Sequence, residues 1–154
     1  ANAEYRQYRA RRRVVSYGGK YDFTHGRLDD APPLPAWLTP LRVRAAAWAG
    51  LDPDTVSQAL IAEYSPGTPL GWHRDVPDFQ AIVGVSLGDV ATMRFRRYPP
   101  QREGGKAARA ELKLALAPRS IYTLQGDARW GWQHAVSPTR ALRYSITFRT
   151  RIGA

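Results

Sequence analysis

Alternating apolar and polar residues occupy most of the chain after Gly50. Runs with a period of two predict β-strands that bury one face. The predicted strands are 57–64, 81–87, 91–98, 109–116, 120–124, 130–136 and 142–149. Glycine, proline and other turn residues separate them. Many short strands at this spacing predict a sandwich, a barrel or a jelly roll.

The segment before the helix described below predicts a β-hairpin followed by a loop. Residues 11–17 form a strand-type run that ends at Gly18 and Gly19, and residues 20–23 are expected to return as the second arm. Residues 27–40 contain four prolines and are expected to be loop.

One helix is predicted between residues 39 and 50. Thr39 is a suitable N-terminal cap, Pro40 suits the first helical position, and Gly50 suits the end. Apolar residues on one stripe recur at spacings of four and three, namely Leu41, Ala45 and Trp48.

Length and composition indicate one globular domain. The chain has 154 residues, of which 44% are hydrophobic and 23% charged, and this argues against disorder. It has no cysteine, which excludes disulfide scaffolds, zinc ribbons, iron–sulfur clusters and thiol nucleophiles. No window approaches 18 consecutive apolar residues, and the first 13 residues do not form a signal-peptide hydrophobic run. A cytoplasmic location is therefore the expectation, by elimination.

The basic residues leave two explanations open. The net charge is +10, and only three of the 23 basic residues are lysine. Arginine pairs bidentately with phosphate and carboxylate, so nucleic acid or an anionic small molecule is a natural partner. A G/C-rich codon composition explains the excess of Arg, Ala, Gly and Pro equally well.

A histidine and an aspartate two residues apart form a candidate metal site. In an extended segment His73 and Asp75 point the same way, and His134 on a later predicted strand completes two histidines and one carboxylate. That set suits non-haem Fe(II), because it leaves three coordination positions open. Spacing alone favours a surface His73 paired with Asp75. The third histidine, His25, is expected in a loop.

The last predicted strand divides its residues strictly between two faces. One face carries Leu142, Tyr144, Ile146 and Phe148, and the other carries Arg143, Ser145, Thr147 and Arg149. If the strand lines the mouth of a barrel, the arginine face points into a cavity and would bind a small dicarboxylate. The alternative is a half-exposed strand with a solvated face.

Five segments together resemble the AlkB family of Fe(II)/2-oxoglutarate-dependent dioxygenases. They are 64–67 (YSPG), 72–75 (WHRD), 82–88 (IVGVSLG), His134 and 143–149 (RYSITFR). Their order matches the family's Y-x-P-G, H-x-D, I-V-x-V-S-L, distal histidine and R-x5-R blocks. The resemblance implies a mainly β fold with a flanking helix, built around a double-stranded β-helix (jelly-roll) dioxygenase core.

The resemblance also implies a domain organisation. A single AlkB-like domain is expected over residues 1–154, with its jelly-roll catalytic core at 57–151. Residues 1–26 are expected to hold the hairpin of a substrate-recognition lid. Family members have a further strand and helix before this hairpin, so the chain is expected to be truncated at its N-terminus.

The resemblance implies a role for each matching residue. His73, Asp75 and His134 correspond to the ligands of a catalytic Fe(II). Arg143 corresponds to the residue that binds the distal carboxylate of the co-substrate 2-oxoglutarate. Further co-substrate contacts are expected from Tyr64, Ser145 and Arg149. O2 is the other reactant, and an oxidised N-methyl group is released as formaldehyde.

The same resemblance implies substrate-binding positions. Tyr21 and Trp72 are expected to stack on an unpaired base, with ordinary core packing as the alternative. Arg74 and Arg129 are expected to be rim charges that contact phosphate. Asp78 is an approximate counterpart of the acidic residue that touches the base in DNA-repairing members.

The chain departs from the family pattern near the co-substrate. Ala62 and Ser145 stand where the family often has asparagine. We therefore expect a weaker hold on 2-oxoglutarate.

Three functions remain open at this stage. The first is DNA or RNA repair by oxidative demethylation of N-alkylated bases in single-stranded nucleic acid, carried out by a monomer. The second keeps iron and 2-oxoglutarate but hydroxylates or demethylates a protein or a small molecule. The third is a non-catalytic jelly-roll binding module, which the presence of all three ligands and both arginines disfavours.

Overall fold

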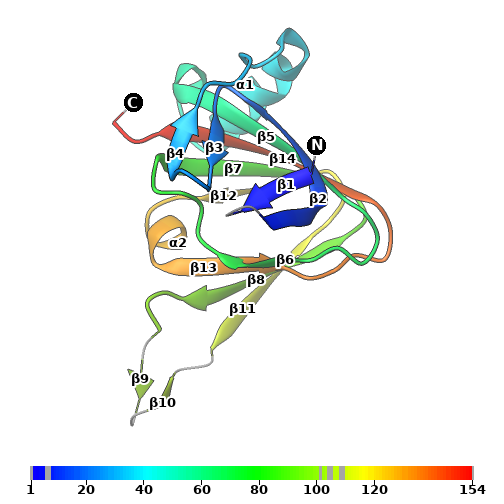
Figure 1. Cartoon of the computed structure of the whole chain (residues 1–154), viewed down its shortest axis with the longest axis vertical. Helices are drawn as coiled ribbons and strands as arrows, with labels where there is room; N and C mark the ends of the chain where they lie inside the picture. The colour runs from blue at the N-terminus through cyan, green and yellow to red at the C-terminus, as the bar shows by residue number, and fades with distance from the viewer. Residues whose placement is uncertain (1, 6–7, 101, 104–105, 108–109, 154) are drawn as a thin grey trace.

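Two antiparallel sheets form the body of the protein. A computed structural model describes residues 2–5, 8–100, 102–103, 106–107 and 110–153. In Figure 1 the larger sheet crosses the middle of the molecule and the smaller sheet lies below it. This arrangement confirms the predicted jelly roll.

The larger sheet has six strands. Their spatial order is β1 (Asn2–Tyr5), β2 (Tyr8–Tyr17), β5 (Val56–Tyr64), β14 (Arg143–Arg151), β7 (Phe79–Gly88) and β12 (Ser120–Leu124). The smaller sheet has the order β11 (Glu111–Leu116), β8 (Ala91–Arg97), β13 (Trp132–Val136) and β6 (Leu70–His73).

Short elements connect and cover the two sheets. Two-stranded pairs are formed by β3 (Lys20–Asp22) with β4 (Arg27–Asp29), and by β9 (Arg102–Glu103) with β10 (Lys106–Ala107). The helical segments are η1 (Ala36–Leu38), α1 (Thr39–Trp48), η2 (Pro53–Thr55) and α2 (Asp127–Trp130).

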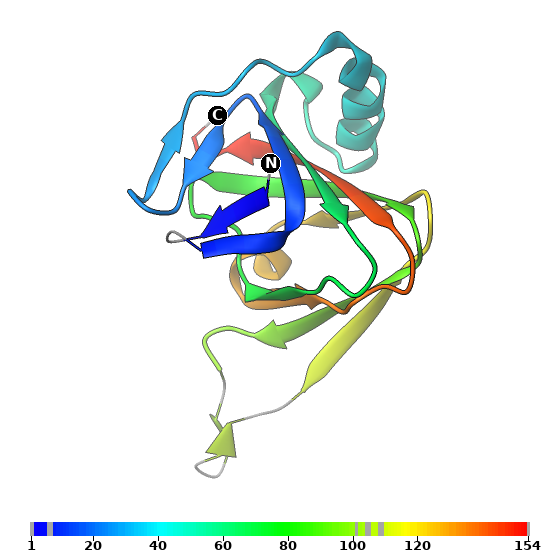
Figure 2. The same ribbon diagram turned by 45° about the vertical axis from the view of Figure 1, so that its right-hand side comes forward.

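The main hydrophobic core lies between α1 and the outer face of the larger sheet (Figure 2). Ile146 and Phe148 of β14 are buried in one cluster with Leu38, Ala45 and Ala46. A second cluster lies between the sheets and joins residues of β8, β11 and β13 to the ring of Tyr122 on β12. The apolar face predicted for the last strand is therefore the face that α1 covers.

The polar face of β14 points into the space between the sheets. Arg143, Ser145 and Thr147 are only 1%, 6% and 8% exposed. These values exclude the solvated face that was the alternative for this strand. The interior of the jelly roll is consequently lined on one side by arginine, serine and threonine.

The expected hairpin of residues 11–23 does not form. Strand β2 pairs with β1 and β5, while β3 pairs with β4, so part of the expected loop at 27–40 is strand. A local turn explains the pairing of β3. Asp22 accepts hydrogen bonds from the backbone of Thr24 and His25, and Gly26 takes φ 65°.

The helix lies where it was predicted, but two details were wrong. Leu38, without a side-chain cap, precedes the first residue Thr39. Trp48 is 55% exposed, whereas Ala46 is buried beside Ala45, because a rotation of about 100° per residue carries position 48 off the covered face. Gly50 follows the helix with φ 73°, as expected.

Strand ends after Gly50 differ from the sequence prediction by up to two residues, and a short strand was missed. Trp130 belongs to α2, so the strand that carries His134 begins at Trp132. Strand β6, which carries His73, was not predicted, because its four residues are too short for a periodic pattern. Residue 109, expected to begin a strand, lies outside the described residues.

Candidate metal centre

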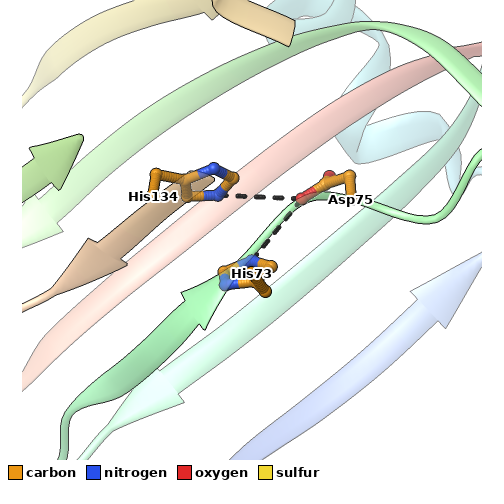
Figure 3. A group of neighbouring side chains, drawn as sticks. All are labelled: His73, Asp75 and His134. Carbon is orange, nitrogen blue, oxygen red and sulfur yellow. Dashed lines mark ion pairs between the residues drawn. The ribbon is translucent and has the colours of Figure 1, made fainter. Parts of the chain in front are cut away.

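Two strands of the smaller sheet bring the predicted ligands together. His73 at the end of β6 and His134 on β13 are register partners, and Asp75 follows two residues after His73. The two imidazole centroids are 4.2 Å apart. One Asp75 oxygen, Oδ1, lies 3.6 Å from Nε2 of His73 and 3.7 Å from Nε2 of His134 (Figure 3). All three donor atoms lie within 4.8 Å of one another, which is suitable for a single metal ion.

The surroundings keep both histidines suited to metal binding. Nδ1 of His73 lies 2.8 Å from the carbonyl oxygen of Gly71. Donation to that carbonyl places the ring proton on Nδ1 and leaves the lone pair of Nε2 for a metal. Burial, together with the nearby His73, lowers the pKa of His134 to about 4. His134 is therefore neutral at pH 7, the form that binds metals.

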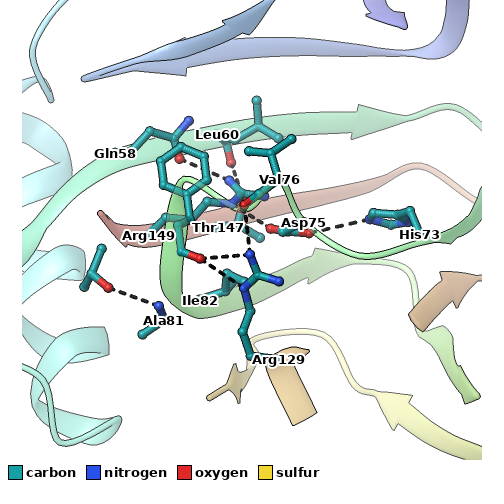
Figure 4. Close-up of polar contacts among 12 residues, drawn as sticks. Gln58, Leu60, His73, Asp75, Val76, Ala81, Ile82, Arg129, Thr147 and Arg149 are labelled. Carbon is teal, nitrogen blue, oxygen red and sulfur yellow. Dashed lines mark hydrogen bonds and ion pairs between the residues drawn. The ribbon is translucent and has the colours of Figure 1, made fainter. Parts of the chain in front are cut away.

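Arg149 holds the carboxylate of Asp75 by its second oxygen. Its Nε donates to Oδ2 over 2.7 Å, while Nη1 donates to Gln58 and Thr147 (Figure 4). Burial acts to raise the pKa of Asp75. The charge of Arg149, with smaller contributions from the two histidines, outweighs that effect, so this pKa lies well below its usual range. The carboxylate is therefore ionised, with Oδ1 directed at the histidines.

Arg129 supports the same carboxylate segment from the other side. It is 2% exposed and donates to the backbone carbonyls of Val76 and Phe79, as Figure 4 shows. These bonds fix the loop that leaves Asp75. The expectation that Arg129 is a phosphate-contacting rim charge was wrong, because α2 turns this side chain into the protein.

Arg143 is a buried cation with spare hydrogen-bonding capacity. It is 1% exposed, its Nε donates to Ser86 Oγ over 3.0 Å, and its guanidinium lies 5.0 Å from the centroid of the Tyr64 ring. Nη1 is buried without a hydrogen-bond partner among the described residues. A buried donor without a partner is costly, and a ligand carboxylate would satisfy it.

The other expected co-substrate residues line the same interior. Tyr64 is 3% exposed and pairs in register with Arg143. Ser145 is buried and pairs with Ser86 on one side and with Ala62 on the other. The residues that the resemblance assigned to iron and to 2-oxoglutarate therefore fit both groups.

Sequence reasoning missed Tyr122, which lies close to this site. It is on β12 and packs against the cluster between the sheets. Burial raises the pKa of Tyr122, and the negative charge of Asp75 adds to the effect, so its hydroxyl is protonated. The period of two in 120–124 gave the only signal, since it places Ser120, Tyr122 and Leu124 on one face.

Trp72 does not lie where its expected role requires. It precedes His73 on a strand, so its ring lies on the opposite face. There the guanidinium groups of Arg94 and Arg96 lie 4.9 and 4.4 Å from the ring centroid. The proposal that Trp72 stacks on a base beside the metal is thus incorrect.

The remaining substrate candidates lie outside the metal cluster. Tyr21 packs edge-on against Phe23, with ring centroids 4.8 Å apart. Asp78 lines an open concavity of about 630 Å³ together with residues of β4 and the end of β14. Arg74 is exposed, donates to the carbonyl of Trp130 over 2.8 Å, and lies over the ring of Tyr98. Among these residues Arg74 lies nearest in sequence to the metal ligand Asp75.

The fold and the three ligands define an iron oxygenase of the jelly-roll class. The chain belongs to the 2OG-Fe(II) oxygenase superfamily, whose sequence profile matches residues 3–149. The solved structure titled "The structure of OsALKBH1" has a TM-score of 0.68 and 18% identity, and the match covers 91% of this chain and 78% of that one. This likeness supports the fold.

Three relatives illustrate the sequence similarity. Uncharacterized protein L905 of Acanthamoeba polyphaga mimivirus is 34% identical over 62% of this chain and 48% of its own length. The alkylated DNA repair protein ALKBH8 homolog of Arabidopsis thaliana is 29% identical over 82% of this chain and 42% of its own length. The alpha-ketoglutarate-dependent dioxygenase alkB homolog 3 of Mus musculus is 26% identical over 90% of this chain and 51% of its own length. The chain thus spans about half the length of these relatives.

Among the described residues, none of the helices has the length and apolar character needed to cross a membrane.

Proposed function

We propose that this protein is an Fe(II)- and 2-oxoglutarate-dependent dioxygenase that removes alkyl groups from bases of single-stranded nucleic acid. One observation carries the proposal: a three-ligand cluster and a buried, unsatisfied arginine donor line the same interior. When bound, iron and 2-oxoglutarate with O2 supply the oxidation of a C–H bond, after which a hydroxylated N-methyl group leaves as formaldehyde.

The chain's own residues orient the reactants. His73 and His134 offer neutral nitrogen donors, and Asp75 offers one oxygen while Arg149 holds the other. Arg143 would bind the distal carboxylate in a buried environment, where a charge-assisted hydrogen bond is strong. Hydrogen bonds to Gly71, Arg149 and Ser86 orient His73, Asp75 and Arg143, respectively.

The substrate would approach along an apolar row of the smaller sheet. Leu112, Phe95, His134 and His73 are successive register partners across its four strands. The ring of Phe95 lies 6.3 Å from that of His134, and Leu112 is 57% exposed. This row leads from the surface to the metal ligands and would support a flat, unpaired base. A base within a duplex would first have to be flipped out.

The names of the relatives favour nucleic acid over other substrates. The Arabidopsis relative is called an alkylated DNA repair protein, and a relative from Xenopus tropicalis is called a tRNA (carboxymethyluridine(34)-5-O)-methyltransferase. The proposal includes action as a monomer.

The test is formaldehyde release from single-stranded oligonucleotides that carry N-methylated adenine or cytosine. We expect formaldehyde and succinate in equal amounts, neither product with His73→Ala, and little formaldehyde from unmethylated controls. If succinate forms while no oligonucleotide yields formaldehyde, nucleic acid is the wrong substrate. A protein or small-molecule substrate would then replace it.

A further inference from the structure

Tyr122 has a hydroxyl group for which the site described above provides no role. Its ring belongs to the inner face of the larger sheet, packed against the cluster between the sheets. Tyr122 is partly buried, and no side chain or backbone group among the described residues forms a hydrogen bond with its hydroxyl, whose oxygen is not fully enclosed. The hydroxyl is therefore free to donate to water or to a ligand.

Gly84 shows how far the phenol reaches across the sheet. Tyr122 and Gly84 are register partners, and Gly84 pairs in turn with Thr147 of β14. A Cβ atom on Gly84 would lie 2.2 Å from Cζ of Tyr122 and 2.4 Å from its hydroxyl oxygen. The far end of the ring therefore lies directly over β7, in a space that only glycine leaves open. Its hydroxyl therefore lies over β7, the neighbour of the edge strand β12.

Arg143 of β14 reaches the same strand, β7, close to the position where the phenol lies. Arg143 is bonded through Nε to Ser86, which is two residues from Gly84 and on the same face. Two residues along a strand are about 6.6 Å apart. A carboxylate that accepts one hydrogen bond of about 2.8 Å from each side spans a gap of this order.

Ser120 adds a second unsatisfied hydroxyl beside this gap. It is the register partner of Ser86, and its Oγ is buried without a partner among the described residues. Donors of Arg143, Ser120 and Tyr122 thus surround one stretch of β7. A neutral phenol suits this place, since another cation would repel Arg143 and Arg149.

We propose that Tyr122 is a co-substrate-binding residue whose hydroxyl donates to the distal carboxylate of 2-oxoglutarate, opposite Arg143 and beside Ser120. This inference rests on the proposed function, because it takes 2-oxoglutarate as the co-substrate. It adds a contact from β12 to the contacts that β5 and β14 provide. The three donors together would select 2-oxo acids that carry a second carboxylate.

The test measures binding without turnover. Protein loaded with Mn(II) is titrated with 2-oxoglutarate in a calorimeter, and oxalate is the comparison ligand because it chelates the metal but has no distal carboxylate. Tyr122→Phe should raise the Kd for 2-oxoglutarate about tenfold or more, as for loss of a hydrogen bond to a charged group. The Kd for oxalate should not change. Tyr17→Phe, which alters a tyrosine packed in the outer core, is the matched control.

Two results would overturn the assignment of Tyr122 as a co-substrate-binding residue. An unchanged Kd for 2-oxoglutarate in Tyr122→Phe, or equal weakening of both ligands, would overturn the assignment. If Tyr122→Phe folds poorly, Ser120→Ala gives a second measurement. This variant should raise the Kd for 2-oxoglutarate and leave the Kd for oxalate unchanged. If wild-type protein binds no 2-oxoglutarate, the proposed function fails as well. If wild-type protein binds it and both variants match wild type, only this inference fails.

Discussion

Asp75 divides its two oxygens between different tasks. Oδ1 faces both histidines, and Oδ2 accepts from Arg149. We predict one Fe(II) per chain, replaceable by Mn(II), Co(II) or Ni(II). His73→Ala should lower metal affinity by more than the 10–100-fold that loss of an outer-shell partner costs. Metal analysis after dialysis measures this, with His25→Ala as control. Full loading of His73→Ala would refute the ligand assignment.

Arg143 gives a prediction for the co-substrate. Removing one partner of a buried charge pair costs about 2–5 kcal/mol. Arg143→Ala should therefore raise the Kd for 2-oxoglutarate roughly 30-fold or more, at about 1.4 kcal/mol per decade. Arg143→Lys should recover only part of this, since lysine lacks the bidentate fork. An unchanged titration in the alanine variant would show that the carboxylate binds elsewhere.

These residues also show what sequence reasoning captures at this scale. Local spacing placed His73 and Asp75 on one side and alternation placed Arg143 and Arg149 on one face, but only the family motifs assigned roles to these residues. Trp72 was misassigned because neighbouring strand residues face opposite sides. Tyr122 was missed because its position depends on Gly84, a glycine on another strand.

The turn between β7 and β8 anchors the strand that carries both arginines. The backbone N–H of Asp89 donates to the carbonyl of Leu142, directly before Arg143. The Asp89 carboxylate accepts from the backbone of Arg140 and Ala141. These contacts join the turn to the segment before β14.

Register between sequence-distant elements depends on such contacts. The pairing of β2 with β5 could therefore not be predicted from either strand alone.

Asp89 makes the stability of this junction depend on pH. Backbone hydrogen bonds, chiefly from Ala141, lower the pKa of Asp89 below its ordinary value of 3.8. A lowered folded-state pKa contributes stability above the unfolded-state pKa, and that contribution is lost as pH falls through the folded-state value. Asp89→Asn should therefore lower the Tm at pH 7, and the difference from wild type should shrink below pH 3.8. Thermal unfolding followed by circular dichroism measures this.

The control for this effect is Asp30→Asn, at an exposed position in the segment before η1. It should leave the Tm unchanged at both pH values. If the Tm of Asp89→Asn lies below that of wild type by the same amount at low pH as at pH 7, the charge of the Asp89 carboxylate does not stabilise this junction.

At the scale of the whole molecule, the jelly roll brings together residues from four regions of the chain. Tyr64, Asp75, His134 and Arg143 reach one interior from both sheets. The family motifs made this convergence predictable, although strand periods alone left sandwich, barrel and jelly roll open. The fold also separates the polar interior from the core under α1, so changes in that core should act on stability rather than on chemistry.

The net charge of +10 gives the last prediction, since charge alone does not distinguish phosphate contacts from codon composition. Phosphate contacts release counterions, so log Kobs for a single strand falls with log salt at a slope of about −0.7 per contact. Arg74, exposed beside Asp75, should be one such contact. Arg74→Ala should reduce the slope by about 0.7 for a methylated single strand. Arg44→Ala, on the exposed side of α1, should leave it unchanged. If both variants and wild type give the same slope of log Kobs against log salt, the nucleic acid does not contact Arg74.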